Sequence, residues 1–453
     1  MQDYSSEILK WCQEYLILDN PEYYKKERMG LWCGNIPQEI FLYEKDGNDL
    51  ILPFGCVGYL KNAGYALKSS ILPCKRFCYN SNINLYPYQE KAVKEAFRAR
   101  NGVIVMPCGS GKTQTALEII ARLGVKTLWL THTQDLFNQS LNRAKSVLSC
   151  DNSSYGTITG GKVNIGSGLT FATVQTMSKL DLSAYRDTWG CVVVDECHKA
   201  IGSPTKVMQF YKVLSALSCR YKFGLTATPK RADGLERSMY ALLGGKIVEV
   251  SKDDVADTTC PVQVQQINTG YMPNLDMALA GDGTINYAGL VNDLTHNEER
   301  FEKIMETLSK IPFSQPVMVL ANRVEYLQLL CKEYNERQIG NAICLSAMGN
   351  SKSAKQARKQ ALNALDSGEL DCVFATYQLA KEGLDVPNLR YVVFATPEKD
   401  ETTVMQAAGR VGRKAEGKEC GTVIDFVDDF GMYKGWAKKR ERYYKKLGYN
   451  ILT

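Results

Sequence analysis

The sequence predicts an α/β protein in which a small α+β module precedes two parallel-sheet domains in tandem. From about residue 85, short apolar stretches alternate with segments of helical period. Strands that alternate with helices form parallel sheets through right-handed crossovers. The alternation lapses at Ser251–Asn286, which is polar and poor in helical period, and then resumes. We therefore expect a module at residues 1–82, domains at 83–255 and 256–428, and a C-terminal helix at 429–453.

Each domain should contain several buried strands. In the first domain we expect them at Gly102–Met106, Thr127–Thr131, Leu169–Thr173, Cys191–Val194 and Tyr221–Leu225. In the second domain we expect them at Val317–Ala321, Ala342–Ser346, Cys372–Thr376, Tyr391–Ala395 and Gly421–Phe426.

The N-terminal module has a different pattern. Ser6–Leu18 has helical period and places its larger apolar residues on one face. The turn-forming sequence Asp46–Asp49 stands between Glu39–Tyr43 and Leu50–Leu52, which predicts a β-hairpin. At the other end of the chain, Tyr433–Tyr449 is rich in Lys, Arg and aromatic residues. Such a run suits nucleic-acid contact, but we favour an amphipathic helix packed on the second domain.

Composition excludes several classes of protein. No apolar run in the 453 residues approaches the ~20 needed for a membrane span, and Met1–Ser6 has no signal-peptide pattern. Fifteen cysteines without an export signal indicate reduced thiols and a cytoplasmic location. A zinc site is an alternative for the cysteines near the N-terminus, but without a Cys-x-x-Cys pair we favour buried thiols. The net charge of +6 is compatible with a polyanionic partner.

Met106–Thr113 is the most informative segment. It follows an apolar strand and precedes the helical pattern Gln114–Leu123. In that context Gly109, Ser110 and Gly111 would turn backbone N–H groups toward a phosphate, Lys112 would reach the terminal phosphates, and Thr113 would hold Mg²⁺. The strict pattern has Gly where Met106 stands, so the match is partial. The alternative is a Gly-rich connection beside a surface lysine.

Two acids complete the expected site for nucleotide hydrolysis. Asp195 and Glu196 follow the strand Cys191–Val194, at the edge where α/β sheets bind ligands. Asp195 would orient Mg²⁺, and Glu196 would align and deprotonate the attacking water. The alternative is that these two acids have no catalytic role and only form a solvated loop at the end of the strand.

Two arginines in the second domain suit the same chemistry. Arg410 and Arg413 stand three residues apart, which would place them on one face of a helical turn. Without a phosphate loop elsewhere in the chain, two such arginines would be interpreted as part of a solvent-exposed helix face. Together with the phosphate loop they predict arginine fingers that act on a polyphosphate bound between the two domains.

With these residues in place, the chain resembles superfamily 2 helicases over roughly residues 85–428. The resemblance rests on motifs that stand in the family's order: Leu85–Gln89 (Q motif), Met106–Thr113 (I), Leu130–Gln139 (Ia), Thr173–Thr176, Asp195–His198 (II, of DECH type), Thr226–Pro229 (III), Val317–Val324 (IV), Thr376–Asp385 (V) and Gln406–Arg413 (VI).

The resemblance implies two RecA-like motor domains that use ATP and Mg²⁺. It assigns further residues to ATP binding, namely Gln89, Gly383 and Asp385. It assigns coupling of hydrolysis to movement to His198, Thr226, Thr228 and Gln406. It assigns contacts with the nucleic-acid backbone to Thr131, Gln139, Thr173, Gln175 and Thr376, each of which would otherwise be a local cap or turn residue.

Within the superfamily the chain is most similar to compact DNA helicases of the XPB and phage UvsW kind. Tyr287–Arg300, Cys197 in motif II and Gln406 at the start of motif VI carry this likeness. It implies a monomeric enzyme that unwinds or remodels branched DNA, with 3′-to-5′ polarity, beside replication or recombination proteins. Residues 1–82 would then govern the choice among single-stranded and branched substrates.

Three other functions remain open at this point. One is a double-stranded DNA translocase that does not separate strands, another is an ATP-switched nucleic-acid clamp, and the third is a small-molecule kinase. A kinase would not need the paired arginines of a second domain.

Overall fold

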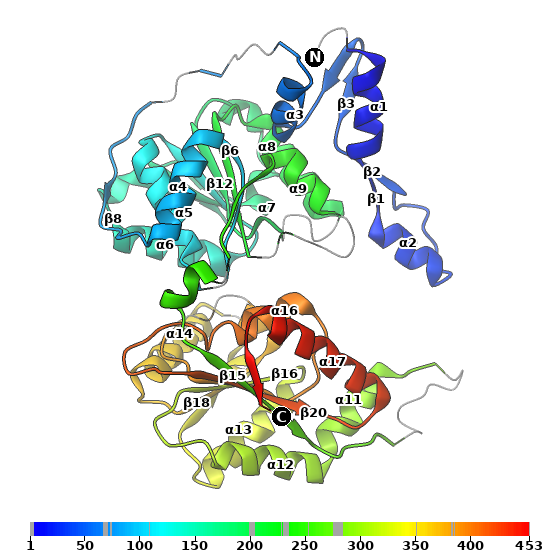
Figure 1. The fold of residues 1–453 in the computed structure, drawn as a ribbon, viewed down its shortest axis with the longest axis vertical. Coiled ribbons are helices and arrows are strands. Elements are labelled where there is room, and N and C mark those ends of the chain that lie inside the picture. Colours follow the sequence, from blue (N-terminus) through cyan, green and yellow to red (C-terminus); the bar gives the residue numbers. More distant parts are fainter. Residues whose placement is uncertain are drawn as a thin grey trace. The chain divides into compact units, whose positions relative to one another are not determined.

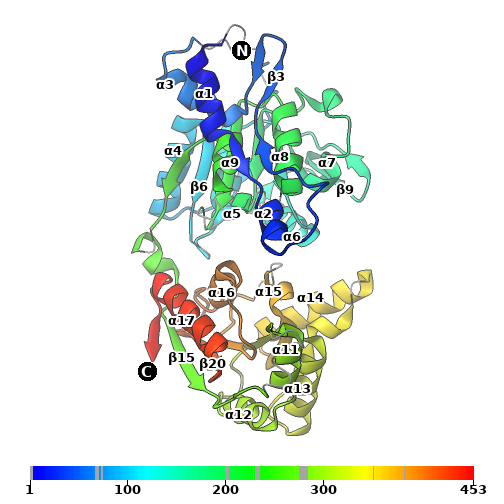
Figure 2. The same ribbon diagram turned by 90° about the vertical axis from the view of Figure 1, so that its right-hand side faces the viewer.

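The computed structural model describes residues 4–66, 71–72, 75–107, 109–198, 204–227, 229, 235–251, 253–274, 284–349, 351–381, 384 and 386–452. The chain divides into two compact units, Met1–Asp254 and Val255–Thr453. Each unit is built on an open sheet of mostly parallel strands, with helices on both faces (Figures 1 and 2). The predicted α/β class with two parallel-sheet domains is confirmed. None of the described helices is long and apolar enough to cross a membrane.

The sheet of the first unit has eight strands in the order β10-β9-β11-β7-β12-β13-β6-β14. Their bounds are β6 Asn101–Val105, β7 Thr127–Thr131, β9 Tyr155–Thr159, β10 Lys162–Asn164, β11 Leu169–Thr173, β12 Cys191–Val194, β13 Tyr221–Thr226 and β14 Lys246–Glu249. All pairs are parallel except β9 with β10 at one edge. The five predicted strands are present, because strands buried on both faces have near-continuous apolar sequences.

Two layers of helices cover this sheet. On one face lie α4 Pro87–Ala99, α5 Lys112–Leu123 and α6 Gln134–Val147; on the other lie α7 Val174–Met177, α8 Pro204–Ala216 and α9 Glu236–Leu243. Short elements complete the unit: β5 Asn80–Ser81, β8 Leu148–Ser149, η2 Asn152–Ser154 and η3 Leu182–Tyr185.

The N-terminal module is α+β, as predicted, but its strands pair differently. It contains α1 Ser6–Tyr15, β1 Ile17–Asp19, α2 Pro21–Arg28, β2 Glu39–Phe41, β3 Glu44–Asp46, β4 Asp49–Ile51, η1 Phe54–Cys56 and α3 Val57–Asn62. The predicted turn is correct, since β3 and β4 pair across it with Asp46 opposite Asp49. The segment Glu39–Phe41 pairs instead with β1, which the sequence had placed in the end of the first helix.

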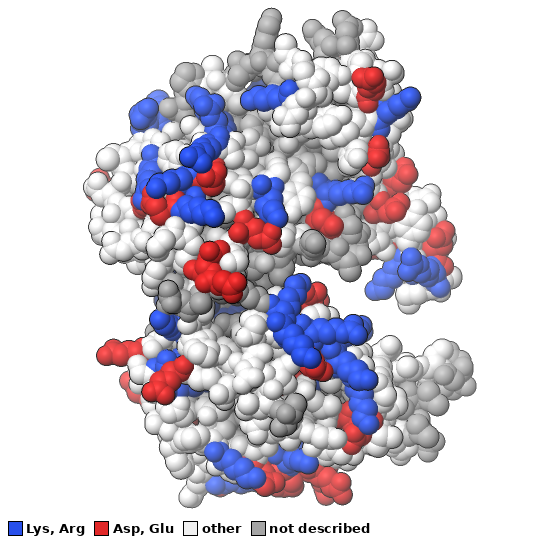
Figure 3. Space-filling model, in the orientation of Figure 1, with Lys and Arg blue, Asp and Glu red and all other residues white. Residues whose placement is uncertain are grey.

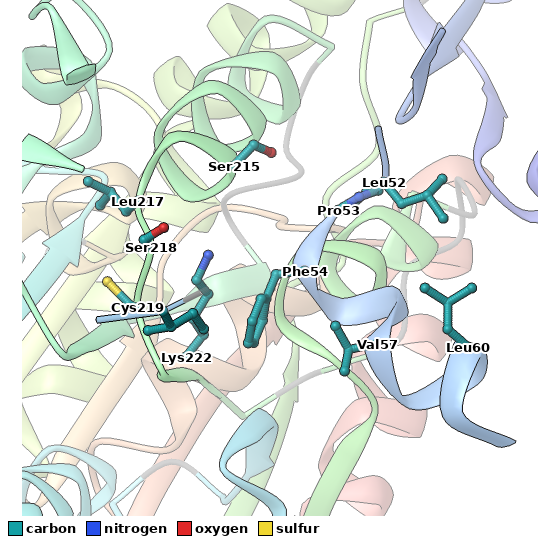
Figure 4. A pocket seen from close by; sticks show the side chains of 11 residues that line it. Leu52, Pro53, Phe54, Val57, Leu60, Ser215, Leu217, Ser218, Cys219 and Lys222 are labelled. Atoms are coloured by element: carbon teal, nitrogen blue, oxygen red, sulfur yellow. The ribbon is translucent and has the colours of Figure 1, made fainter. Parts of the chain in front are cut away.

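The module shares a hydrophobic core with the sheet behind it. Apolar side chains of α1, β4 and α3 join those of α8 and α9 in one cluster. A Cβ atom on Gly55 would lie 2.3 Å from the carbonyl oxygen of Tyr240, so η1 rests directly on α9. Beside this contact, the ring of Phe54 covers the Lys222 ammonium at 4.6 Å, at the wall of a cavity of about 240 Å³ (Figure 4).

The sheet of the second unit has seven parallel strands in the order β17-β18-β16-β19-β20-β15-β21. Their bounds are β15 Val262–Asn268, β16 Val317–Ala321, β17 Ala342–Cys344, β18 Cys372–Thr376, β19 Tyr391–Phe394, β20 Gly421–Val427 and β21 Asn450–Leu452. Strand β15 lies within Ser251–Asn286, where no strand was predicted. The chain after Cys344 turns into a short 3₁₀ helix, η6 Leu345–Met348, so β17 is shorter than predicted.

Successive residues of these strands face opposite helical layers. Val317 and Val319 pack on α12 Glu298–Ser309 and α13 Val324–Glu336, whereas Met318 and Leu320 pack with residues of the other layer. That second layer contains α14 Lys352–Ser367, α15 Tyr377–Lys381, α16 Glu401–Ala408 and α17 Gly431–Lys446. The remaining elements are η5 Asp253–Thr258 and α11 Tyr287–His296.

The basic C-terminal segment is helical and packed on its own unit. In α17 the buried residues are Tyr433, Ala437, Arg440 and Tyr444. The guanidinium of Arg440 is buried and lies 2.8 Å from the Asp425 carboxylate on β20. The helix therefore packs on the second unit as expected, but Trp436, Tyr443 and Leu447, which we expected to be buried, are only half-buried. One of its basic residues belongs to the interior.

Candidate active site

The phosphate loop lies between β6 and α5. Gly109 and Gly111 have φ angles of +81° and +78°, a conformation that side chains with a Cβ rarely adopt. The helix begins at Lys112, two residues earlier than predicted, which places Lys112 and Thr113 in its first turn. The first N–H groups of a helix have no partner within the helix and attract anions. Met106, the departure from the strict pattern, is buried and donates its N–H to the Thr226 carbonyl at 2.9 Å.

Gln89 holds this loop from α4. Its Nε2 donates to the Ser110 carbonyl at 2.9 Å, and the Tyr88 hydroxyl donates to the same oxygen at 3.0 Å. A Cβ on Gly111 would lie 2.4 Å from that Nε2, so the glycine is required for this approach. The Lys112 ammonium donates to the Pro107 carbonyl at 3.3 Å. Tyr88 stands within the Q motif, but no sequence pattern marks it as a contact of the loop.

Asp195 and Glu196 follow β12. The buried Asp195 carboxylate accepts a hydrogen bond from the Ser140 hydroxyl at 3.2 Å and another from the Glu196 N–H at 2.9 Å. Burial, and then the Glu196 charge, raise the pKa of Asp195 to about 6, whereas the Lys112 charge lowers this pKa. Lys112 and Asp195 are therefore close enough to interact. Ser140 had no distinguishing pattern in the sequence.

These residues fit a nucleotide polyphosphate and its divalent cation. The left-handed glycines open the loop toward a ligand, and a helix N-terminus faces it. Asp195 is a buried carboxylate whose ionised form a cation would favour over the protonated one. Gly109, Ser110, Gly111 and Lys112 would hold the phosphates, and Thr113 and Asp195 would hold Mg²⁺.

His198 connects the acids to the neighbouring strand. Its Nδ1 atom lies 3.2 Å from a carboxylate oxygen of Glu196 and 2.9 Å from the hydroxyl of Thr226, the last residue of β13. Two of the residues expected to couple hydrolysis to movement are thus in contact. Thr228 lies outside the described residues.

The residues expected to contact nucleic acid in this unit lie at adjacent strand ends. Thr131 and Thr173 are directly opposite each other in β7 and β11. The Thr131 hydroxyl donates to the Thr133 carbonyl, the hydroxyls of Thr173 and Thr176 are 2.9 Å apart, and Gln175 donates to the His132 carbonyl. The two threonines therefore make local bonds, whereas Gln175 bonds to a residue 43 positions earlier in the chain. Gln139 is half-buried on α6.

The two arginines of the second unit occupy different environments. Arg410 is buried, and its guanidinium donates to the carbonyls of Ala380 and Leu384. Arg413 is half-buried and pairs through its backbone with Thr259. The expectation of a shared helix face is wrong, because α16 ends at Ala408 and the chain continues as turns.

Four other residues of the second unit were expected to contact nucleotide or nucleic acid or to couple hydrolysis to movement. Gln406 lies in the last turn of α16. Thr376 ends β18 and accepts a hydrogen bond from the Leu379 N–H at 3.3 Å, which caps α15. Gly383 and Asp385 lie outside the described residues. In the described parts of the chain, no three His, Cys, Asp or Glu side chains gather as a metal site would need.

Comparison with known families places both units. Residues 82–231 match the family model of the type III restriction enzyme res subunit. Residues 299–415 match that of the helicase conserved C-terminal domain.

Individual relatives match across most of the chain. A candidate ATP-dependent RNA helicase of Acanthamoeba polyphaga mimivirus, L396, is 27% identical over 81% of this chain and 69% of its own length. The DNA 3′-5′ translocase XPB2 of Sulfurisphaera tokodaii is 25% identical over 74% of this chain and 80% of its own length. The ATP-dependent DNA helicase uvsW of phage T4 is 24% identical over 92% of this chain and 86% of its own length.

A solved structure supports the fold. The DNA-bound type ISP restriction-modification enzyme LlaBIII superposes with a TM-score of 0.60 at 17% identity, covering 81% of this chain and 30% of that protein. The motif order, the phosphate loop with its paired acids and these matches agree, and the chain belongs to the superfamily 2 helicases, in the group that contains XPB and T4 UvsW.

Proposed function

We propose that this protein is an ATP-dependent DNA helicase that unwinds or remodels branched DNA with 3′-to-5′ polarity, in replication, recombination or repair. The observation that carries the proposal is the connection from the hydrolytic acid to the neighbouring strand end. Glu196 contacts His198, and His198 contacts Thr226. A change at the phosphates therefore has a short physical route to β13 and to motif III.

Each residue of the site has a distinct proposed task. Lys112 binds the terminal phosphates, and Glu196 orients and deprotonates the attacking water. Bound magnesium would neutralise phosphate charge. Arg413 contributes a cation to the transferring phosphoryl group, while Arg410 positions the motif V backbone through its two carbonyl contacts. Gly383 and Asp385 of motif V, and Gln406, complete the nucleotide contacts and their coupling.

DNA is the proposed substrate because it is named for the XPB2 and uvsW relatives. Thr131, Gln139, Thr173, Gln175 and Thr376 would grip phosphates without reading bases. We propose a cytoplasmic, DNA-associated monomer that works beside replication or recombination proteins.

The test is hydrolysis of ATP with Mg²⁺ in the presence of single-stranded DNA, forked DNA or single-stranded RNA. DNA should stimulate turnover, and Lys112→Ala and Glu196→Gln should each lower it by about 10²–10⁴-fold. Neither change should alter the melting temperature much. Wild-type hydrolysis by Lys112→Ala would contradict the site, and stimulation by RNA alone would contradict the substrate.

A second candidate is a double-stranded DNA translocase that leaves the strands paired. The match of residues 82–231 to a restriction-enzyme subunit favours it. Displacement of a third strand from a triplex, without separation of a forked duplex, would select this function over the first.

A further inference from the structure

The part of the N-terminal module formed by α2 and the loop after it extends away from the sheet. In Figure 1 it lies on the side of the first unit opposite α4 and α5, and Figure 2 shows it from the front. No residue of α2 is buried. At its base Asn20 caps the helix and donates to the Pro37 carbonyl at 2.6 Å, and the Tyr24 hydroxyl accepts a hydrogen bond from Gln38 Nε2 at 3.0 Å. The segment contributes little to a core, so its sequence is free to serve another purpose.

The loop nevertheless has a defined conformation. Helix α2 ends in a Schellman motif, in which the Leu31 N–H donates to the Lys26 carbonyl at 2.9 Å and the Gly30 N–H to the Glu27 carbonyl at 2.9 Å. Gly30 has the φ of +64° that this motif needs. The thiol of Cys33 then donates to the Leu31 carbonyl at 3.2 Å. These bonds fix the backbone that presents Trp32.

Trp32 forms a flat apolar surface at this tip. Its side chain lies so close over Gly34 that a Cβ there would be 2.3 Å from the indole ring. Part of the ring thus lies against the backbone at Gly34, and the residue is still 75% exposed. Met29 and Leu31, which flank it, are 62% and 50% exposed. A fixed, open aromatic ring is the geometry that base stacking requires.

Basic residues precede Trp32 in the last turn of α2. The last turn of α2 carries Lys25, Lys26 and Arg28, whereas the acid Glu22 is in the first turn. Glu27 is the acid among the basic residues. Figure 3 shows Lys and Arg gathered at the end of this projecting segment. Charge complementarity therefore favours a polyanion, and the exposed ring favours one with accessible bases.

We propose that α2 and residues 29–34 form a platform that binds the branch point of DNA. Trp32 stacks on the last base pair at the branch point, and Lys25, Lys26 and Arg28 contact the adjacent phosphates. Inside a duplex both faces of each base pair are covered by its neighbours, and an isolated strand has no base pair, so the platform distinguishes forks from both. The inference rests on the proposed DNA helicase function and assigns substrate choice to named residues.

The test compares the binding of full-length protein to a fork and to its isolated single strand. Stacking on an aromatic side chain contributes about 1–3 kcal/mol per base, so Trp32→Ala should weaken fork binding by about 5- to 150-fold. It should not change binding of the single strand, or ATP hydrolysis at saturating single strand. Trp32→Phe should retain most of the fork preference. A 2-aminopurine at the branch point should be quenched by the wild type but not by Trp32→Ala.

Phe313 provides the matched control. It is an aromatic residue of the second unit that is 73% exposed, so Phe313→Ala removes a similar surface and should leave fork preference unchanged.

Three outcomes would overturn the platform. The first is a Trp32→Ala variant that prefers forks as strongly as the wild-type protein does. The second is a wild-type protein that binds forks no better than single strands. The third is an oligomer of the wild-type protein, detected by light scattering, that dissociates in the Trp32→Ala variant. The tip would then be an interface between copies of the chain. Fork binding without stimulation of ATP hydrolysis would defeat the proposed motor function and leave the platform standing.

Discussion

The Nδ1 atom of His198 lies 2.9 Å from the hydroxyl of Thr226, and both side chains are buried. His198 follows the paired acids after β12, and Thr226 ends β13, the neighbouring strand. The same nitrogen is 3.2 Å from Glu196. This single ring therefore joins Glu196, which we propose acts on water, to the end of strand β13.

His198→Ala and Thr226→Val should uncouple hydrolysis from unwinding. Neither change removes Lys112, Asp195 or Glu196, so ATP hydrolysis should persist within about tenfold while strand displacement falls by a larger factor. Thr226→Ser keeps the hydroxyl and should behave as the wild type. Parallel measurement of phosphate release and of displacement from a fork checks this. Equal losses of both activities would indicate structural damage.

Arg410→Ala and Arg413→Ala should fail for different reasons. The Arg410 guanidinium is buried on two backbone carbonyls, and leaving them unpaired should cost about 1–3 kcal/mol of stability. Arg413→Ala should leave the melting temperature unchanged but lower kcat by about 10³–10⁵, as loss of an arginine finger does. Thermal unfolding and kcat, measured on both variants, separate the two roles. A stable Arg410→Ala would contradict the contacts described.

Gly55→Ala should destabilise the first unit. The new Cβ would meet backbone atoms of α9 at 2.3–2.5 Å, and backbone cannot yield as a side chain tip can. Overpacking of this kind costs about 1–3 kcal/mol. Gly58→Ala is the matched control, since that position in α3 has open space around it and alanine favours a helix. Denaturant unfolding should show a loss for the first variant and none for the second.

Lys222→Met should change how stability depends on pH. Burial lowers the pKa of Lys222 from 10.5 to about 8, while the unfolded chain keeps the ordinary value. Between pH 8 and 10.5 the unfolded state then binds more protons than the folded state, so this residue adds stability as pH rises. Methionine does not titrate, so it makes no such pH-dependent contribution to stability. The stability of the variant relative to the wild type should therefore fall by about 3 kcal/mol across that range.

Urea unfolding at pH 7.5, 9 and 10.5 measures this difference. Comparison with the wild type is needed because buried tyrosines and cysteines, whose pKa values are raised, have the opposite effect on stability as pH rises. Lys332→Met, at an exposed position, is the control. A difference that is constant with pH would show that Lys222 is not buried as described.

The phosphate loop and the strands around it could be predicted because their signals are local. A buried parallel strand is a continuous apolar run, and a turn of glycines before a helix has few other uses. Strand β15 was not predicted because its alternation of apolar residues with glutamines is short and breaks at Gln266, and its partners β20 and β21 come from the far end of the chain. No local pattern reports such a pairing.

The two arginines show the limit of spacing as a guide. A spacing of three residues places two side chains on a shared helix face only if the helix continues through both residues. Gly409 and Gly412 stand at that point and disfavour helix, and α16 has already ended. The contacts of Arg410 with the carbonyls of Ala380 and Leu384 depend on tertiary packing. Tertiary packing cannot be read from the local sequence.

The shared core beneath η1 constrains how this protein could be re-engineered or could diverge. A graft of residues 1–82 onto another motor would need the α9 surface that receives Gly55, and deletion of the module would uncover apolar side chains of α8 and α9. The module and the first parallel-sheet domain are therefore inherited as one cooperative piece. New substrate preferences would arise more readily by replacing side chains on the projecting α2 tip than by exchanging modules between helicases.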